Sequence, residues 1–120
     1  MAGQMVHLEI PAGDTKKARE FWGGLFGWEF QAYEGSPSEY LIARFSETQG
    51  GAIMADDGSV KGPRVYFDVD DINVGAARVK ELGGDASEAM PVPDMGWFAT
   101  CSDTQGNAFG LWQTDPSASM

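Results

Sequence analysis

The sequence contains a single cysteine, Cys101, and a single histidine, His7, among its 120 residues. A lone cysteine excludes a disulfide bond within the chain, so we expect a reducing, cytoplasmic environment. Cys101 has no basic neighbour in the sequence, only Ser102 and Asp103, and a nucleophilic role is not expected for it. His7 is left to be interpreted as a metal ligand, a catalytic base or a core residue with a satisfied hydrogen bond.

Basic residues and long hydrophobic runs are also scarce. The chain has 8 Lys and Arg against 18 Asp and Glu, a net charge of −10. Without a basic patch, nucleic acid and anionic membranes are not expected as partners. No apolar run approaches the roughly 20 residues that span a bilayer. The segment MAGQMVHLEI has no basic region followed by a long apolar stretch, so a secretory signal is not expected.

The first half of the chain has the pattern of a strand, a helix and three further strands. MVHLEI alternates apolar and polar side chains, which predicts a half-buried strand with His7 and Glu9 on one face. Asp14 can cap a helix over residues 15–26, and Gly27 can end it. Three strand-like runs follow, with GSPS and SETQGG between them as turns: WEFQAYE, EYLIARF and GAIMA.

The second half repeats this order after DDGSVKGP, which we interpret as a linker. RVYFDVD alternates like the first strand, and INVGAARVKELGG is typical of a helix. DASEA, GWFATCS and NAFGLWQ predict three more strands, whereas the two prolines of MPVPDM predict a loop. At one constant spacing the halves align, which indicates an internal repeat: Asp14 falls on Asp71, Gly27 on Gly84 and His7 on Arg64.

We therefore predict an α+β fold of two βαβββ modules in a single domain, residues 1–120. Module one covers about 4–56, the linker about 57–62 and module two about 63–114. A four-stranded sheet with a helix on one face leaves the other face uncovered. Two such sheets side by side would form an eight-stranded curved sheet, a trough whose concave face is free for a ligand.

Three stretches resemble the vicinal oxygen chelate superfamily, which includes glyoxalase I, extradiol dioxygenases and the bleomycin-resistance proteins. They are HLEIPAGDTKKAREFWGGLFGWEF, VYFDVDDINVGAARVKELGG and SDTQGNAFGLWQ. Together they cover nearly the whole chain, and the likeness is closest to small single-chain glyoxalase-like proteins. The resemblance implies the two-module fold and its pocket.

In metal-bearing members of that superfamily, four ligands come from the first and last strands of each module. The resemblance places His7 at the first ligand position and Arg64 at the second, with the other two at or beside Ile53 and at Gly110. A protonated guanidinium has no lone pair to donate. Metal sites need three or four protein ligands as a rule, so we expect no metal and no other cofactor.

Strand alternation predicts which side chains share the concave face. We expect a polar patch on it in which Arg64 binds an anion or carbonyl oxygen of a ligand. The alternative is a self-satisfied network of Arg64 with Glu9 or Asp68. The predicted catalytic residues are His7 and Glu9, and the predicted ligand-binding residues are Arg64, Tyr66, Asp68, Met54, Trp97 and Trp112; Phe98 is assigned to the core.

Three functions are compatible with these patterns. The first is a metal-independent protein of the glyoxalase and bleomycin-resistance type that binds an apolar or aromatic small molecule. The second is a glyoxalase-like lyase or isomerase that uses His7 and Glu9 as acid and base. The third is a structural or regulatory dimer without a ligand. A homodimer is expected in each case, because sheet edges are usually covered by a second copy.

Overall fold

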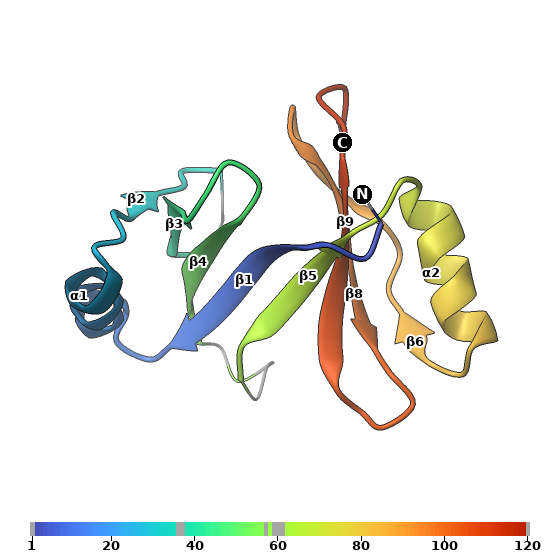
Figure 1. Cartoon of the computed structure of the whole chain (residues 1–120), viewed down its shortest axis with the longest axis horizontal. Helices are drawn as coiled ribbons and strands as arrows, with labels where there is room; N and C mark the ends of the chain where they lie inside the picture. Colours follow the sequence, from blue (N-terminus) through green and yellow to red (C-terminus); the bar gives the residue numbers. More distant parts are fainter. Residues whose placement is uncertain (1, 36–37, 57, 59–61, 120) are drawn as a thin grey trace. The chain divides into compact units, whose positions relative to one another are not determined.

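The computed structural model describes residues 2–35, 38–56, 58 and 62–119 (Figure 1). Residues 57 and 59–61 of the predicted linker, and residues 36–37 of the predicted GSPS turn, lie outside the described residues. The chain divides into two compact units. The first unit is His7–Arg64, and the second unit is Met1–Val6 together with Val65–Met120.

The first unit has the predicted order of strand, helix and three strands. Its sheet is ordered β2-β3-β4-β1, with β1 parallel to β4 and the other pairs antiparallel. The elements are β1 (Met5–Ala12, in this unit from His7 onward), α1 (Thr15–Phe26), β2 (Gln31–Ala32), β3 (Tyr40–Arg44) and β4 (Gly50–Ala55).

Local signals set the ends of α1 as predicted. The Asp14 carboxylate accepts a hydrogen bond from the backbone N–H of Lys17 at 3.0 Å. Gly27 ends the helix in the left-handed conformation, with φ of 74°, and donates its N–H to the Gly23 carbonyl. One side of α1 packs on the sheet through Ala18 and Trp22. The core there contains Phe30, Leu41, Ala43 and Ile53.

The second unit follows the same plan with one additional short strand. Its sheet is ordered β5-β9-β8-β6, with β5 parallel to β9, and β7 also pairs with β8. The elements are β5 (Arg64–Asp68, in this unit from Val65 onward), α2 (Ile72–Glu81), β6 (Asp85–Ala86), β7 (Met90–Val92), β8 (Gly96–Ser102) and β9 (Ala108–Thr114).

Two details of the second half differ from the prediction. The segment predicted as a loop contains β7, because Pro91 lies on an edge strand, where a missing N–H is tolerated. The helix does not extend to Gly84 as the repeat suggested. It ends at Glu81, and Gly83 takes the positive φ, 98°. At its start Asp71 accepts from the N–H groups of both Asn73 and Val74.

The two faces of the second sheet are filled differently. The face under α2 has a core of Ile72, Ala99, Cys101 and Leu111. Trp97 packs against this core, because it alternates in step with Ala99 and Cys101 along β8. Trp97, predicted as a ligand-binding residue, therefore lies on the face that α2 covers. Phe98, assigned to the core from the sequence, lies on the opposite face, and its ring centroid is 6.4 Å from that of Tyr66.

Neither helix of the described residues has the length and hydropathy needed to cross a bilayer.

Candidate functional site

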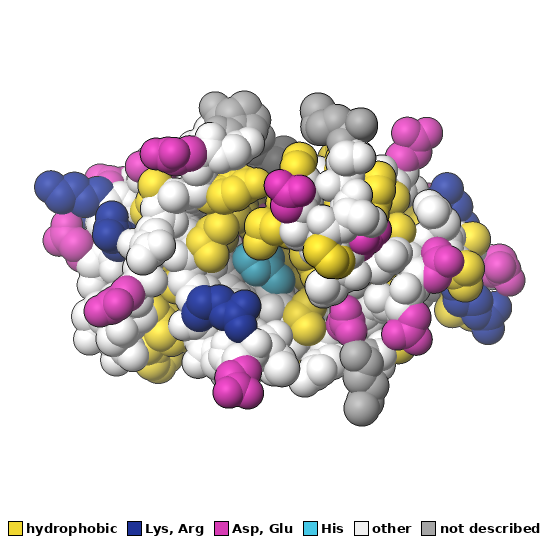
Figure 2. Space-filling view, turned by 90° about the horizontal axis from the view of Figure 1, so that it is seen from above, with side chains coloured by type: hydrophobic (Ala, Val, Ile, Leu, Met, Phe, Trp, Pro, Cys, Tyr) yellow, Lys and Arg dark blue, Asp and Glu magenta, His cyan; other side chains and the backbone are white. Residues whose placement is uncertain are grey.

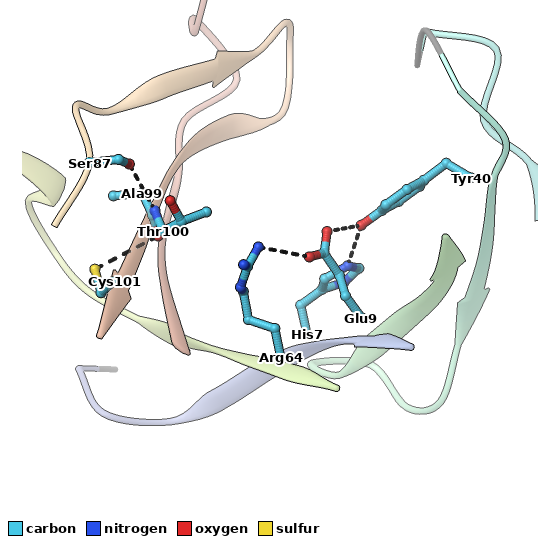
Figure 3. Close-up of polar contacts among 8 residues, drawn as sticks. All are labelled: His7, Glu9, Tyr40, Arg64, Ser87, Ala99, Thr100 and Cys101. Carbon is cyan, nitrogen blue, oxygen red and sulfur yellow. Dashed lines mark hydrogen bonds and ion pairs between the residues drawn. The ribbon is translucent and has the colours of Figure 1, made fainter. Parts of the chain in front are cut away.

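A connected polar cluster lies in the first unit (Figure 3). It is on the sheet face opposite α1, since Leu41, next to Tyr40, belongs to the core under that helix. The Nε2 atom of His7 is 2.8 Å from the Tyr40 hydroxyl, which donates a hydrogen bond of 2.7 Å to Oε2 of Glu9. The other carboxylate oxygen of Glu9 lies 3.7 Å from Nη1 of Arg64. The structure thus brings together His7, Glu9 and Arg64, which the sequence singled out, and adds Tyr40.

Strand pairing explains how Tyr40 reaches this cluster. β4 lies between β1 and β3, so the Tyr40 ring must extend over β4 to meet β1. At the register of Glu9, β4 carries only Ala52, whose small side chain leaves that path open. Met54 pairs with Tyr40 and, by alternation, lies on the same face. Of the predicted ligand-binding residues, Met54 and Arg64 therefore share the face of His7.

The hydrogen bonds indicate which atoms carry protons. Tyr40 has one hydroxyl hydrogen and donates it to the Glu9 carboxylate. His7 then donates its Nε2 hydrogen to the Tyr40 oxygen, which leaves Nδ1 of a neutral ring without a proton. Burial lowers the pKa of His7 below its ordinary 6.5, although the negative charge of Glu9 acts to raise it. His7 is accordingly neutral at pH 7.

Burial is the main cause of this neutral state, and the charge that acts on the ring is that of Glu9. Figure 2 shows the His7 ring accessible from outside the molecule, so a ligand can approach it. A neutral imidazole can accept one hydrogen bond and donate another, which suits both binding and proton transfer.

Arg64 pairs with Glu9, as one of the two sequence interpretations proposed, but loosely. Its side chain is 17% exposed, and the 3.7 Å separation exceeds the 2.7–2.9 Å of a strong charged hydrogen bond. Its buried Nε has no hydrogen-bond partner within the described part of the chain. Asp68, the other predicted partner, belongs to the second unit, where it pairs with Trp112 of β9.

The remaining predicted residues form an aromatic face in the second unit, opposite α2. Tyr66 pairs with Gly110, and Asp68 with Trp112, so the four share one face. A Cβ atom at Gly110 would stand 2.3 Å from ring carbons of Tyr66. The Tyr66 ring therefore fills the space over the position at which the resemblance implies a fourth metal ligand.

The side chains at the four implied ligand positions do not fit a metal ion. His7 can coordinate, but Arg64 has no lone pair. Ile53 lies in the core beneath α1, and its neighbours Ala52 and Met54 offer at most a weak thioether donor. At Gly110 an aromatic ring takes the place of a carboxylate. Across the described residues, no three His, Cys, Asp or Glu side chains gather as a metal site would require.

Sequence reasoning did not identify Tyr40 as a site residue. The run EYLIARF shows that Tyr40 and Ile42 share a face of a strand. Nothing in it shows that this strand lies two places from the one that carries His7. An aromatic hydroxyl at the start of a half-buried strand was the only available signal.

Comparison with known proteins assigns the family. The model of the family described as "Glyoxalase-like domain" matches residues 5–112, most of both units. The chain belongs to this glyoxalase-like family. It is 32% identical to a glyoxylase-like domain-containing protein of Didymella fabae over 91% of this chain and 92% of that protein. It is 27% identical to the putative glyoxylase CFP32 of Mycobacterium bovis, of which it spans 44%.

Solved structures confirm the fold of the glyoxalase-like chain. Methylmalonyl-CoA epimerase from Mycobacterium tuberculosis matches with a TM-score of 0.71 at 17% identity, over 95% of this chain and 89% of that one. A methylmalonyl-CoA epimerase in complex with methylmalonyl-CoA and NH4+ matches with a TM-score of 0.70 at 14% identity over the full length of both. These structures confirm the predicted α+β fold, and the family model confirms the superfamily resemblance.

Proposed function

We propose that this glyoxalase-like chain is a metal-independent protein that binds an apolar or aromatic small molecule. The observation that carries the proposal is Arg64, which stands at a family ligand position and pairs with Glu9 at 3.7 Å. A guanidinium there repels a divalent cation rather than holding it. It also offers N–H donors to an oxygen atom of an organic ligand.

The incomplete hydrogen bonding of Arg64 supports a role in binding. Leaving a buried donor unsatisfied costs about 1–3 kcal/mol, so native structures rarely retain one without a reason. Arg64 keeps a buried Nε without a partner in the described residues, and its only ion pair is long. A carbonyl or carboxylate oxygen from a ligand would draw the side chain into better geometry and satisfy it.

Apolar surface suited to a ligand is present on the helix-free sheet face of each unit, considered separately. Met54 lies beside Tyr40 in the first unit, and a flexible thioether adapts to varied ligand shapes. Tyr66 and Trp112 supply aromatic surface in the second unit. Each unit thus has apolar side chains on the face that carries its predicted site residues.

A glyoxalase-like lyase or isomerase is the alternative, and the Tyr40 hydroxyl favours it specifically. That hydroxyl links His7 to Glu9 by bonds of 2.8 and 2.7 Å, which forms a path for a proton between a neutral base and a carboxylate. Structures with this fold include epimerases by name. In this alternative His7 abstracts a proton from a carbon atom of the substrate, and the negative charge of Glu9 stabilises the imidazolium that forms.

Binding can be tested with protein treated with a chelator. Apolar and aromatic compounds would first be screened for those that raise its melting temperature. The affinity of these compounds would then be measured by calorimetry for the unmodified chain and for Arg64→Gln. We expect this change to weaken binding roughly tenfold, because a charged hydrogen bond contributes about 1.5–3 kcal/mol. Arg78→Gln is the matched control, since its ion pair with Glu81 on α2 is exposed. If no compound binds, or if Arg64→Gln and Arg78→Gln behave alike, the proposal fails.

Metal independence has its own test. Protein purified without chelator should contain well below one equivalent of metal per chain by elemental analysis. Added nickel, cobalt or zinc should not raise the melting temperature through His7. One equivalent of metal per chain that is lost in His7→Ala would indicate a metal enzyme and contradict the proposal.

The alternative function is tested with the same bound compounds. They would be incubated with protein in deuterated water and followed by NMR. Exchange of a carbon-bound proton, or turnover, that is lost in both His7→Gln and Tyr40→Phe would establish the lyase or isomerase. Binding without exchange of a carbon-bound proton and without turnover would support small-molecule binding as the function.

A further inference from the structure

Three aromatic side chains lie on the helix-free face of the second unit. Tyr66 is on β5, Phe98 on β8 and Trp112 on β9, the strand between them. Phe98 pairs directly with Trp112, and Tyr66 pairs with Gly110 of the same central strand. The Tyr66 and Phe98 rings meet edge to face, at an interplanar angle of 73°. Tyr66 and Phe98 therefore form a ring pair, and Trp112 lies on the same face at the register of Phe98.

Two glycines determine how these rings lie. A Cβ atom at Gly96 would stand 2.6 Å from the indole of Trp112, and one at Gly110 would stand 2.3 Å from the ring of Tyr66. Side chains on a strand normally stand perpendicular to the sheet. Here each ring instead lies down over a glycine, in space that any other residue would occupy. The benzo edge of the Trp112 indole thus reaches over Gly96 of β8.

A hydrogen bond holds the Trp112 indole in this orientation. Its Nε1 donates to Oγ1 of Thr114 at 3.0 Å, two residues along the same strand. Tyr66 is only 4% exposed, whereas Trp112 is partly exposed. With the indole close to Gly96 and its N–H bonded to Thr114, the exposed part of the ring is left to meet a ligand.

We infer that Trp112 is a preoriented stacking platform for a planar aromatic ligand that carries no negative charge. The inference rests on the proposed binding function and specifies its ligand class. A ring held in one orientation before binding loses little entropy when a second ring stacks on it. The charged residue at this register is Asp68, and the chain has a net charge of −10, so an anionic ring is disfavoured.

The protein offers a matched control in Trp97. Both tryptophans are on adjacent strands of the same sheet, but Trp97 packs under α2 and donates its indole N–H to Asp115 at 3.0 Å. A ligand that stacks on Trp112 does not contact Trp97. Their indole N–H signals in NMR spectra of nitrogen-labelled protein can be assigned with Trp97→Phe and Trp112→Phe.

The probes are 2-naphthol and its saturated analogue decahydro-2-naphthol, which differ in planarity and aromaticity but share one hydroxyl. We expect 2-naphthol to shift the Trp112 signal and not that of Trp97, and to bind at least about fivefold more tightly than the saturated compound, the low end of what one stacked ring contributes. Trp112→Leu should weaken 2-naphthol binding by the same factor, and Trp97→Phe should leave it unchanged.

Thr114→Val tests orientation without truncating the ring, and Thr114 is exposed, so the fold is preserved. It should weaken 2-naphthol binding while the melting temperature stays near that of the unmodified chain. Equal binding of the two probes, or unchanged binding in both Trp112→Leu and Thr114→Val, overturns the platform. If other compounds still bind and Arg64→Gln weakens them, the proposed function survives that result; if no compound binds at all, it fails as well.

Discussion

At the scale of single residues, Tyr40 organises the polar cluster of the first unit. Its hydroxyl accepts from His7 and donates to Glu9, so one oxygen atom sets both the tautomer of the imidazole and the position of the carboxylate. Arg64 extends the chain of contacts from the other carboxylate oxygen. Each member therefore depends on a neighbour for its protonation state or its orientation.

Replacement of Tyr40 by Phe should reduce the free energy of unfolding by about 1–3 kcal/mol, since a hydrogen bond to a carboxylate and one to a ring nitrogen are lost together. Urea denaturation measures this loss. Tyr33→Phe is the control, because the Tyr33 ring meets that of Tyr40 edge to face without sharing these hydrogen bonds. Equal effects of the two changes would contradict a central role for the Tyr40 hydroxyl.

His7 should make stability depend on pH in a defined window. Its folded-state pKa lies below the 6.5 of the unfolded chain, so between those values the unfolded chain binds more protons. Relative to His7→Gln, the protein should keep its full stability above pH 6.5 and lose stability as the pH falls toward the folded-state pKa, with no further loss below it.

Denaturation at several pH values, compared with His7→Gln, checks this window. As the only histidine, His7 also has a single ring signal in proton NMR spectra. The midpoint of its titration should fall below 6.5. A midpoint above that value would mean that the Glu9 charge, rather than burial, dominates.

At the scale of elements, both helices begin in the same way. Asp14 and Asp71 occupy equivalent positions in the repeat, and each carboxylate accepts from the first turn of its helix. The two helices end differently, with Gly27 closing α1 and Leu82 standing at the end of α2. The start of each helix is thus a stronger local signal than its end.

Asp71→Ala should lower the free energy of unfolding by about 0.5–2 kcal/mol, the usual cost of removing an N-terminal cap. The loss should exceed that of Asp14→Ala, because Asp71 accepts from two backbone N–H groups and Asp14 from one. Thermal denaturation of both variants makes the comparison. A smaller effect at Asp71 would contradict the hydrogen bonds described for α2.

At the scale of the whole molecule, α1 has an apolar surface that its own sheet does not cover. Phe21, Leu25 and Phe26 are 62%, 56% and 56% exposed, whereas Trp22 between them packs into the core. A two-fold axis allows such a surface to cover its own copy. We propose that a second copy of the chain packs against this face of α1.

Sedimentation at micromolar concentration should therefore give about twice 12.9 kDa. A double change of Phe21 and Leu25 to Glu should shift the protein to the monomer, because it places charge within the contact. Val74→Glu is the control, since Val74 is 66% exposed on the other helix. A monomeric unmodified chain, or a dimer unaffected by the α1 changes, would contradict this assembly.

Local sequence patterns predicted both helices, most of the strands and the fold class. Strand alternation, the two aspartate caps and the internal repeat depend on contacts among near neighbours, which composition and spacing record. For the same reason the shared face of His7 and Glu9 could be predicted.

Which strands meet, and what their side chains contact, depends on pairing between segments that are distant in the sequence. Tyr40 joins His7 because β4 places β3 two positions from β1, a pairing between distant segments that no local pattern encodes. Trp97 and Phe98 exchanged their predicted faces, since burial of Ala99 and Cys101 under α2 set the phase of β8. From the sequence alone, either Trp97 or Phe98 could face the core. A shift of one residue in the alternation moves every side chain of the strand to the opposite face.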